Sequence, residues 1–136
     1  MKSFDIRPLD GVGPVHFGMT REGVHAALAP PETVDDAREW FLGGFAVDFD
    51  SNGKVEFLEF AASERFRVMF HHQCMHQFAA DDAVAFLSQY SDYDANDPEL
   101  GYTYMFPKLQ LSLWRPTTEE PHFHAVAIGR DGYFDA

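Results

Sequence analysis

Hydrophobic residues recur along the chain in two periods, which divide it into helical and extended segments. Val24, Ala27 and Leu28 have the i, i+3, i+4 spacing of one helix face, so a helix is predicted over residues 21–28. Thr20 precedes this helix and can accept a hydrogen bond from an amide of its first turn. Two prolines follow the helix and end it, because proline lacks an amide donor and restricts the residue before it.

A second helix is predicted over residues 81–90. Ala83, Phe86, Leu87 and Tyr90 form its apolar stripe, and two aspartates stand at its beginning. Acidic side chains are favourable there because the amino end of a helix carries a partial positive charge.

Alternating apolar and polar residues are typical of half-buried strands, and they fill most of the remaining chain. The pattern predicts a hairpin in which residues 45–49 and 54–61 flank the turn Asp50-Ser51-Asn52-Gly53, because Asn-Gly tolerates positive φ. Other strands are expected at residues 3–7, 39–42, 66–75, 102–106, 109–114 and 123–128, and Tyr133-Phe134 is expected to return to the sheet.

Each half of the chain therefore has the order strand, helix, strands, with a break near residue 62. The sequence predicts an α+β fold in which two helix-plus-antiparallel-sheet units form a pseudo-repeat, with halves 1–62 and 63–136. Neither half alone buries both a sheet face and its helix well, so we expect one compact domain over residues 1–136.

The composition supports a folded domain in a reducing compartment. Of the 136 residues, 46% are hydrophobic and 15% aromatic, which is enough for a core. No apolar run approaches the roughly 20 residues of a membrane span, and the first residues lack the apolar stretch of a signal peptide. Cys74 is the single cysteine, so an internal disulfide is impossible and a cytoplasmic location is expected.

The formal net charge of −12 limits the classes of partner. Nucleic acid and anionic membranes are disfavoured, because binding to either needs clustered Lys and Arg side chains. A basic protein partner is compatible with this charge and would associate faster because of it. The alternative interpretation is that the acidic excess only maintains solubility.

One segment matches the pattern of an EF-hand calcium loop, from Asp48 through Asp50 and Asn52-Gly53 to Glu59. Such a loop needs a helix on each side, whereas strand-like alternation flanks this one. We therefore expect a β-hairpin with an acidic tip, and a weak surface calcium site is the alternative.

Five residues could supply nitrogen and sulfur ligands to zinc. His72, Cys74 and His76 share one face if residues 66–75 are extended, and His122 and His124 are spaced in the same way. Buried or half-exposed structural histidines are the favoured interpretation, because the short ligand spacings of zinc fingers are absent. No nucleophile motif or phosphate-binding loop is present, so we expect no catalytic residue, no cofactor and no metal.

The polar segment over residues 91–100 is the expected partner-binding loop. Its candidate binding residues are an aromatic side chain among carboxylates: Asp92, Tyr93, Asp94, Asp97 and Glu99. Loops on a rigid scaffold often hold recognition residues. Trp40 and Trp114 are expected to be in the core.

Several segments carry a resemblance to a known family. Phe17-Gly18-Met19-Thr20-Arg21, followed by Val24 and Leu28, resembles the repeat start of β-lactamase-inhibitor-like tandem-repeat proteins. Residues 50–57, 111–115 and 132–135 are similar to small uncharacterised bacterial proteins of this kind, some of them immunity proteins of toxin systems.

Together with the acidic charge, the single cysteine and the lack of a catalytic motif, the resemblance favours a cytoplasmic, non-enzymatic binding protein, for example an immunity or inhibitor protein with a basic protein as its partner. The alternative is a metal-binding protein or metalloenzyme that uses the histidines and Cys74.

Overall fold

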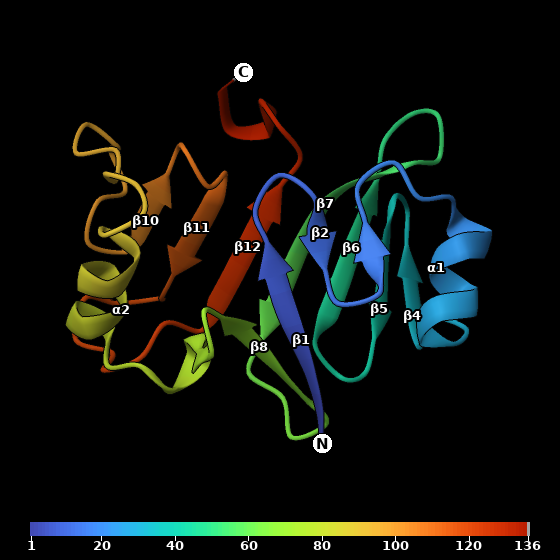
Figure 1. The fold of residues 1–136 in the computed structure, drawn as a ribbon, viewed down its shortest axis with the longest axis horizontal. Helices are drawn as coiled ribbons and strands as arrows, with labels where there is room; N and C mark the ends of the chain where they lie inside the picture. The colour runs from blue at the N-terminus through green and yellow to red at the C-terminus, as the bar shows by residue number, and fades with distance from the viewer. Residues whose placement is uncertain (136) are drawn as a thin grey trace.

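The computed structural model describes residues 1–135 and shows an α+β fold with two β-sheets and two α-helices (Figure 1). The larger sheet has seven strands in the order β10-β11-β12-β7-β6-β5-β4, and all neighbouring strands in it are antiparallel. The smaller sheet has five strands in the order β3-β2-β1-β8-β9, and its central pair, β1 and β8, is parallel.

The strands of the larger sheet are β4 (Thr33–Asp35), β5 (Arg38–Phe41), β6 (Phe45–Phe49), β7 (Val55–Ala61), β10 (Thr103–Phe106), β11 (Leu111–Trp114) and β12 (Ala125–Gly129). Those of the smaller sheet are β1 (Lys2–Arg7), β2 (Gly11–Val12), β3 (Val15–His16), β8 (Phe66–Phe70) and β9 (Gln73–Cys74). The helices are α1 (Arg21–Leu28) and α2 (Ala80–Leu87), with short 3-10 helices η1 (Met75–Gln77) and η2 (Tyr133–Asp135).

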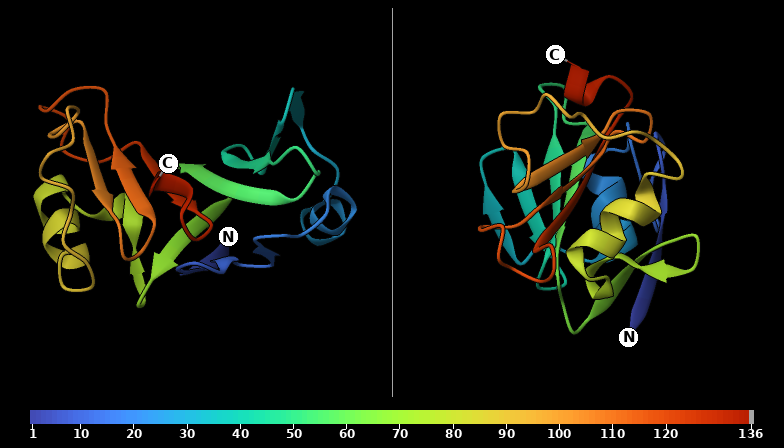
Figure 2. Two further views of the ribbon diagram at one scale, coloured as in Figure 1. Left: turned by 90° about the horizontal axis from the view of Figure 1, so that it is seen from above. Right: turned by 90° about the vertical axis from the view of Figure 1, so that its left-hand side faces the viewer.

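The larger sheet buries one face, here called the inner face. One row of paired residues on this face crosses six strands and is buried throughout: Glu39, Val47, Leu58, Ile128, Leu111 and Phe106. The smaller sheet covers the middle of the inner face, α1 covers the β4–β6 end and α2 covers the β10–β11 end (Figures 1 and 2). Side chains alternate between the two faces of a strand, so the neighbouring residues point the other way.

The opposite, outer face of the larger sheet has no α-helix or strand over it among residues 1–135 (Figure 2). Its corresponding row is Thr33, Trp40, Ala46, Glu59, Ala127, Ser112 and Met105. Both ends of the sheet curve away from the smaller sheet, which makes the outer face concave (Figure 2). The element that lies on it is η2, where the Tyr133 ring stacks on Phe57 at 4.7 Å between centroids.

Both predicted helices are present. The structure confirms α1 over residues 21–28, and the Thr20 hydroxyl accepts a hydrogen bond of 3.1 Å from the amide of Gly23. The second helix begins one residue early and ends at Leu87, before the predicted end at Tyr90. Residues 88–90 continue as a turn, in which the amide of Tyr90 donates to the Leu87 carbonyl.

The predicted hairpin is also confirmed, because β6 and β7 pair on either side of the turn at residues 50–54. The Asp50 carboxylate closes this turn by accepting hydrogen bonds from the amides of Asn52 and Lys54, at 2.9 and 3.0 Å. A bulge between Asp48 and Phe49 shifts the register of the pair by one residue.

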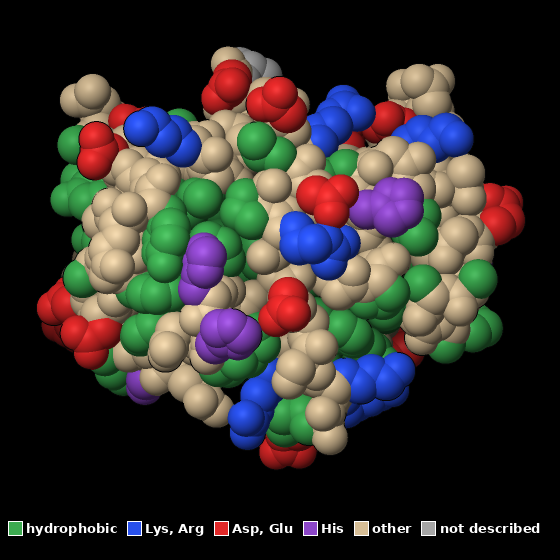
Figure 3. Space-filling view, in the orientation of Figure 1, with side chains coloured by type: hydrophobic (Ala, Val, Ile, Leu, Met, Phe, Trp, Pro, Cys, Tyr) green, Lys and Arg blue, Asp and Glu red, His purple; other side chains and the backbone are tan. Residues whose placement is uncertain are grey.

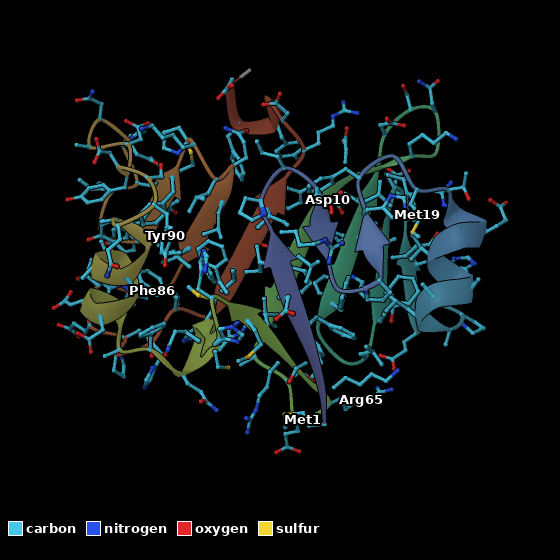
Figure 4. The ribbon with its side chains drawn as sticks, in the orientation of Figure 1. Met1, Asp10, Met19, Arg65, Phe86 and Tyr90 are labelled. Atoms are coloured by element: carbon cyan, nitrogen blue, oxygen red, sulfur yellow. The ribbon has the colours of Figure 1, made fainter. Side chains whose placement is uncertain are left out.

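The prediction of one strand over residues 66–75 is wrong, because the chain reverses between β8 and β9. His71 and His72 occupy the turn with φ of 47° and 66°, the left-handed conformation that tight hairpins require. The His71 ring lies flat on Tyr90, 4.5 Å away, and Figure 4 shows Tyr90 and Phe86 on the side of α2 toward this hairpin. This contact holds the turn although neither residue is glycine.

The expected return of Tyr133-Phe134 to the sheet is wrong as well, since these residues form η2. Gly129 makes this possible, because a Cβ atom there would lie 2.5 Å from Cβ of Tyr133. The buried Gln110 holds η2 by accepting a hydrogen bond from the Phe134 amide and donating one to Asp135.

The two halves of the chain contribute to both sheets. β1 pairs with β8 in the smaller sheet, and β7 pairs with β12 at the centre of the larger one. Phenylalanine rings fill the space between the sheets: Phe4 lies 5.6 Å from Phe45, which lies 4.7 Å from Phe60. Within residues 1–135, no helix has the length and hydrophobicity needed to cross a membrane.

Candidate functional site

The acidic loop over residues 91–100 folds back against the edge strand β10. The amide of Asp94 donates a hydrogen bond to the carbonyl of Met105 at 2.8 Å, which fixes the loop to the strand. Two of its carboxylates shape the loop itself: Asp94 accepts from the Asn96 amide and Asp97 from the Glu99 amide, at 3.0 and 2.9 Å. One oxygen of each carboxylate remains for other contacts.

Tyr93 anchors the loop on the inner side of the sheet. Its ring centroid lies 5.1 Å from that of Tyr104 and 6.2 Å from that of Phe106, both in edge-to-face geometry. The side chain is still 36% exposed. Tyr93 therefore has a packing role in the loop in addition to its exposed edge.

Asp94 and Asp97 lie on the outer side, where they line a pocket of about 290 Å³, here called the acidic pocket. The remaining walls come from the loop, from β10 and β11 and from η2: Pro98, Thr103, Met105, Ser112 and Phe134. The structure thus brings together two of the five predicted residues. Asp92 and Glu99 are exposed and do not line this pocket.

Trp114 is 45% exposed on the outer face, so its predicted place in the core is wrong. The reason is its register on β11, where it follows the fully buried Leu111 and Leu113 and points to the opposite face. Tyr102, at the start of the same sheet edge, is 42% exposed. The predicted place of Trp40 in the core is wrong too, because Trp40 is half-buried at the other end of the outer face, with the Arg38 guanidinium 5.3 Å from its ring centroid.

Arg38 occupies the centre of a charge network at that other end. Its guanidinium donates two hydrogen bonds to Asp48, at 2.6 and 3.0 Å, and one to Glu59 at 2.7 Å. The bonds to Asp48 raise the pKa of Arg38 above its ordinary value. The first and last residues of the calcium-loop pattern are therefore held by one guanidinium group.

The histidines and Cys74 come together only in part. Cys74 and His76 line one pocket of about 220 Å³, and His76, His122 and His124 line a second of about 480 Å³. His72 lies apart, exposed in the β8–β9 turn. In the described part of the chain, no three His, Cys, Asp or Glu side chains are arranged to hold a metal ion.

Sequence reasoning missed a buried carboxylate. Glu39 is 3% exposed on the inner face, where it accepts hydrogen bonds from Arg21 and His25. The available signal was its position in β5, where it alternates with Trp40 and shares the inner face with Phe41. The i, i+4 spacing of Arg21 and His25 places both on one side of α1.

Comparisons of this chain with protein-family models, with curated proteins and with solved structures each give no match.

Proposed function

We propose that this protein is a cytoplasmic, non-enzymatic binding protein of the immunity or inhibitor kind, which holds a basic protein partner on the outer face of its larger sheet. The observation that carries the proposal is the exposed Trp114 on a sheet face that no α-helix or strand of residues 1–135 covers and that also holds the acidic pocket. Tryptophan and tyrosine are enriched among the residues that dominate interface energies, and Tyr102 is exposed at the same end.

Charge supports a basic partner. The chain has 22 acidic and 10 basic residues. At the β10–β11 end, which is on the left in Figure 3, acidic side chains come from the loop, from the β11–β12 connection and from the start of α2: Asp92, Asp94, Asp97, Glu99, Glu119, Glu120, Asp81 and Asp82. The Arg115 side chain at this end is buried and donates hydrogen bonds to the carbonyls of Gly101 and Glu120. Lys108 is therefore the exposed Lys or Arg side chain of residues 91–124. Such a field accelerates encounter with a cationic surface.

The concave shape of the outer face supports a folded protein as the partner rather than a short peptide. The sheet curves around the outer face, and Arg38, Asp48 and Glu59 form a second polar region at its far end. A stable interface buries roughly 800 Å² on each partner, which a small pocket alone does not supply.

We also propose that the two halves of the chain are a pseudo-repeat. Each half begins with a strand of the smaller sheet, β1 or β8, continues through a helix, and ends in strands of the larger sheet. The last strands of the two meanders, β7 and β12, pair with each other. Natural chains that contain one such half and assemble as dimers would support this proposal.

The test of the binding function is affinity capture from a lysate of the native organism, followed by reconstitution with purified proteins. The proposal requires that a basic protein is captured and that it binds the purified wild-type protein directly. A Trp114→Ala, Asp94→Lys double variant should no longer capture it. A Glu64→Lys variant is the matched control, because Glu64 is an exposed residue between β7 and β8. Equal capture by the double variant and wild type would refute this site.

A further inference from the structure

A second cavity lies at the end of β7, beside the segment that leads into β12. Its volume is about 480 Å³, within the range of small-molecule sites, and we call it the histidine pocket. It is lined by Ala61, Ala62, His76, His122, Phe123 and His124. None of these residues belongs to the acidic pocket, and the inference is argued from the histidine pocket alone, although the His124 ring lies 6.3 Å from that of Trp114.

His76 lines this pocket and keeps one unused hydrogen-bond acceptor. Its Nε2 atom lies 3.0 Å from the carbonyl oxygen of Phe60. A carbonyl only accepts, so Nε2 carries the hydrogen and Nδ1 keeps its lone pair in the neutral ring. Burial lowers the pKa of His76, which keeps the ring neutral at physiological pH.

His122 presents a second acceptor by the same logic. Its Nδ1 atom donates to the carbonyl oxygen of Phe78 at 2.7 Å, so the neutral ring has a free lone pair at Nε2. Both rings are thus oriented by backbone carbonyls from outside the pocket. His124 lies on the same side of the chain as His122, with its Nε2 atom 3.4 Å from the Glu120 carboxylate.

The remaining walls are apolar. Two alanine methyl groups and the buried Phe123 ring lie beside the imidazole rings, and the Arg115 guanidinium covers the Phe123 ring at 5.1 Å. No Lys or Arg side chain lines the pocket. The pocket therefore favours a ligand with an apolar body and hydrogen-bond donors, and disfavours an anion.

We propose that the histidine pocket binds a small aromatic molecule that carries a hydroxyl or amino group as a donor. A flat ring suits walls made of an aromatic ring, imidazoles and methyl groups, and its donor hydrogen can bond to the lone pair of either His76 or His122. A site built to pair a donor rejects an analogue that lacks it, because its own polar atoms then lose water without gaining a partner. Phenol is the simplest probe of this class.

The experiment is titration of isotope-labelled full-length protein with phenol at pH 7.5, followed by NMR. Toluene serves as the analogue without a donor and benzoate as the anionic analogue. We expect phenol to give saturable shifts at His76, His122 and Ala62, with toluene and benzoate at least about tenfold weaker, equivalent to 1.4 kcal/mol.

His122→Phe keeps an aromatic ring at an exposed position and removes the acceptor, together with the hydrogen bond to the Phe78 carbonyl, so it tests the site without changing a core residue. We expect it to weaken phenol binding several-fold, whereas His16→Phe, an exposed histidine outside the pocket, leaves binding unchanged. The proposal is overturned if phenol gives no saturable shifts at millimolar concentration, if toluene binds as well as phenol, or if His122→Phe binds like wild type. Stoichiometric zinc at these histidines would also overturn it, because the pocket would then be a metal site.

Discussion

The Nε2 atom of His25 lies 2.6 Å from Oε1 of Glu39, a carboxylate that is almost completely buried between α1 and the larger sheet. The other oxygen of Glu39 accepts a hydrogen bond of 2.8 Å from Arg21, whose guanidinium also lies 4.5 Å from the centroid of the Phe49 ring. Two side chains from consecutive turns of α1 thus end on one carboxylate of β5. The helix is fixed to the sheet by polar contacts as well as by the buried Val24 and Leu28.

Replacing Glu39 tests this polar contact. Glu39→Ala should lower the free energy of unfolding by about 1–3 kcal/mol, because both partners lose a charge-assisted hydrogen bond and the inner face gains a cavity. Arg21 and His25 are partly exposed and can recover water, which limits the loss. Denaturant unfolding measures the change, with Asp10→Ala in the exposed Arg7–Asp10 pair as the control. A loss no larger than in the control would contradict the prediction.

Gly129 tests how η2 is held on the outer face. A methyl group at Gly129 would lie within 2.5–2.8 Å of three Tyr133 atoms, so Gly129→Ala should displace η2 and destabilise the protein by about 1–3 kcal/mol. In a Tyr133→Gly background the same change should cost much less, since all three clashing atoms of the Tyr133 side chain, its Cβ included, are gone. A double-mutant cycle in urea measures the coupling. Additive effects of the two changes would show that the ring does not rest on Gly129.

His76 should make stability depend on pH near neutrality. Burial lowers its pKa in the folded protein, so the unfolded chain binds a proton more readily. Stability from this group is present above the unfolded pKa, about 6.5, and is lost as pH falls through the folded value. The lowered pKa values of Glu32 and Asp50 act in a more acidic window, since carboxyl groups titrate lower.

The measurement is the free energy of unfolding from pH 7.5 to 5.5, for wild type and His76→Gln. We expect wild type to lose stability over this range and the variant to lose less, because glutamine does not titrate. Parallel curves for the two proteins would assign the pH dependence to other histidines.

Once a partner is captured, its binding kinetics should distinguish the effect of long-range charge on association from the effect of direct contacts on dissociation. Asp94→Lys should mainly slow association, and the slowing should diminish at high salt, because screening acts on long-range charge. Trp114→Ala should mainly speed dissociation, with a loss of affinity of about 2 kcal/mol or more. Tyr93→Ala is a less specific probe than the sequence suggests, because its ring also packs on Tyr104.

Stopped-flow or surface plasmon resonance measurements at two salt concentrations give both rates. Glu64→Lys again serves as the control for net charge. If Trp114→Ala dissociates like wild type, the partner does not use this part of the outer face.

The sequence predicts α1 and the β6–β7 hairpin correctly. It does not predict the turn between β8 and β9 or the position of η2. The helix at Arg21–Leu28 follows from its cap and apolar period, and the hairpin follows from Asn52-Gly53. The turn at His71-His72 carries no glycine, and its left-handed backbone depends on packing with Tyr90, which is distant in sequence. The position of η2 likewise depends on Gly129 and Gln110, whose roles appear only when the sheet is assembled.

The candidate sites show the same division. The composition of residues 91–100 predicts an acidic loop. That Asp94 and Asp97 line one pocket on the outer side depends on how the loop packs against β10, which the sequence does not show. The size and apolar character of Trp114 predict a place in the core, and only the strand register shows that its side chain lies on the outer face. Glu39 gave no motif, because its partners come from a helix that lies earlier in the chain.

The parallel pairing of β1 with β8 has a consequence for how the chain acquires its structure. Lys2 pairs with Phe66, so the first strand cannot find its partner until α1 and all four strands β4–β7 have been synthesised. Contacts so distant in sequence close late and slow the search for the native state. We therefore expect the nascent first half to keep an unpaired, apolar strand edge on the ribosome, which makes this protein a natural client for chaperones that shield such edges.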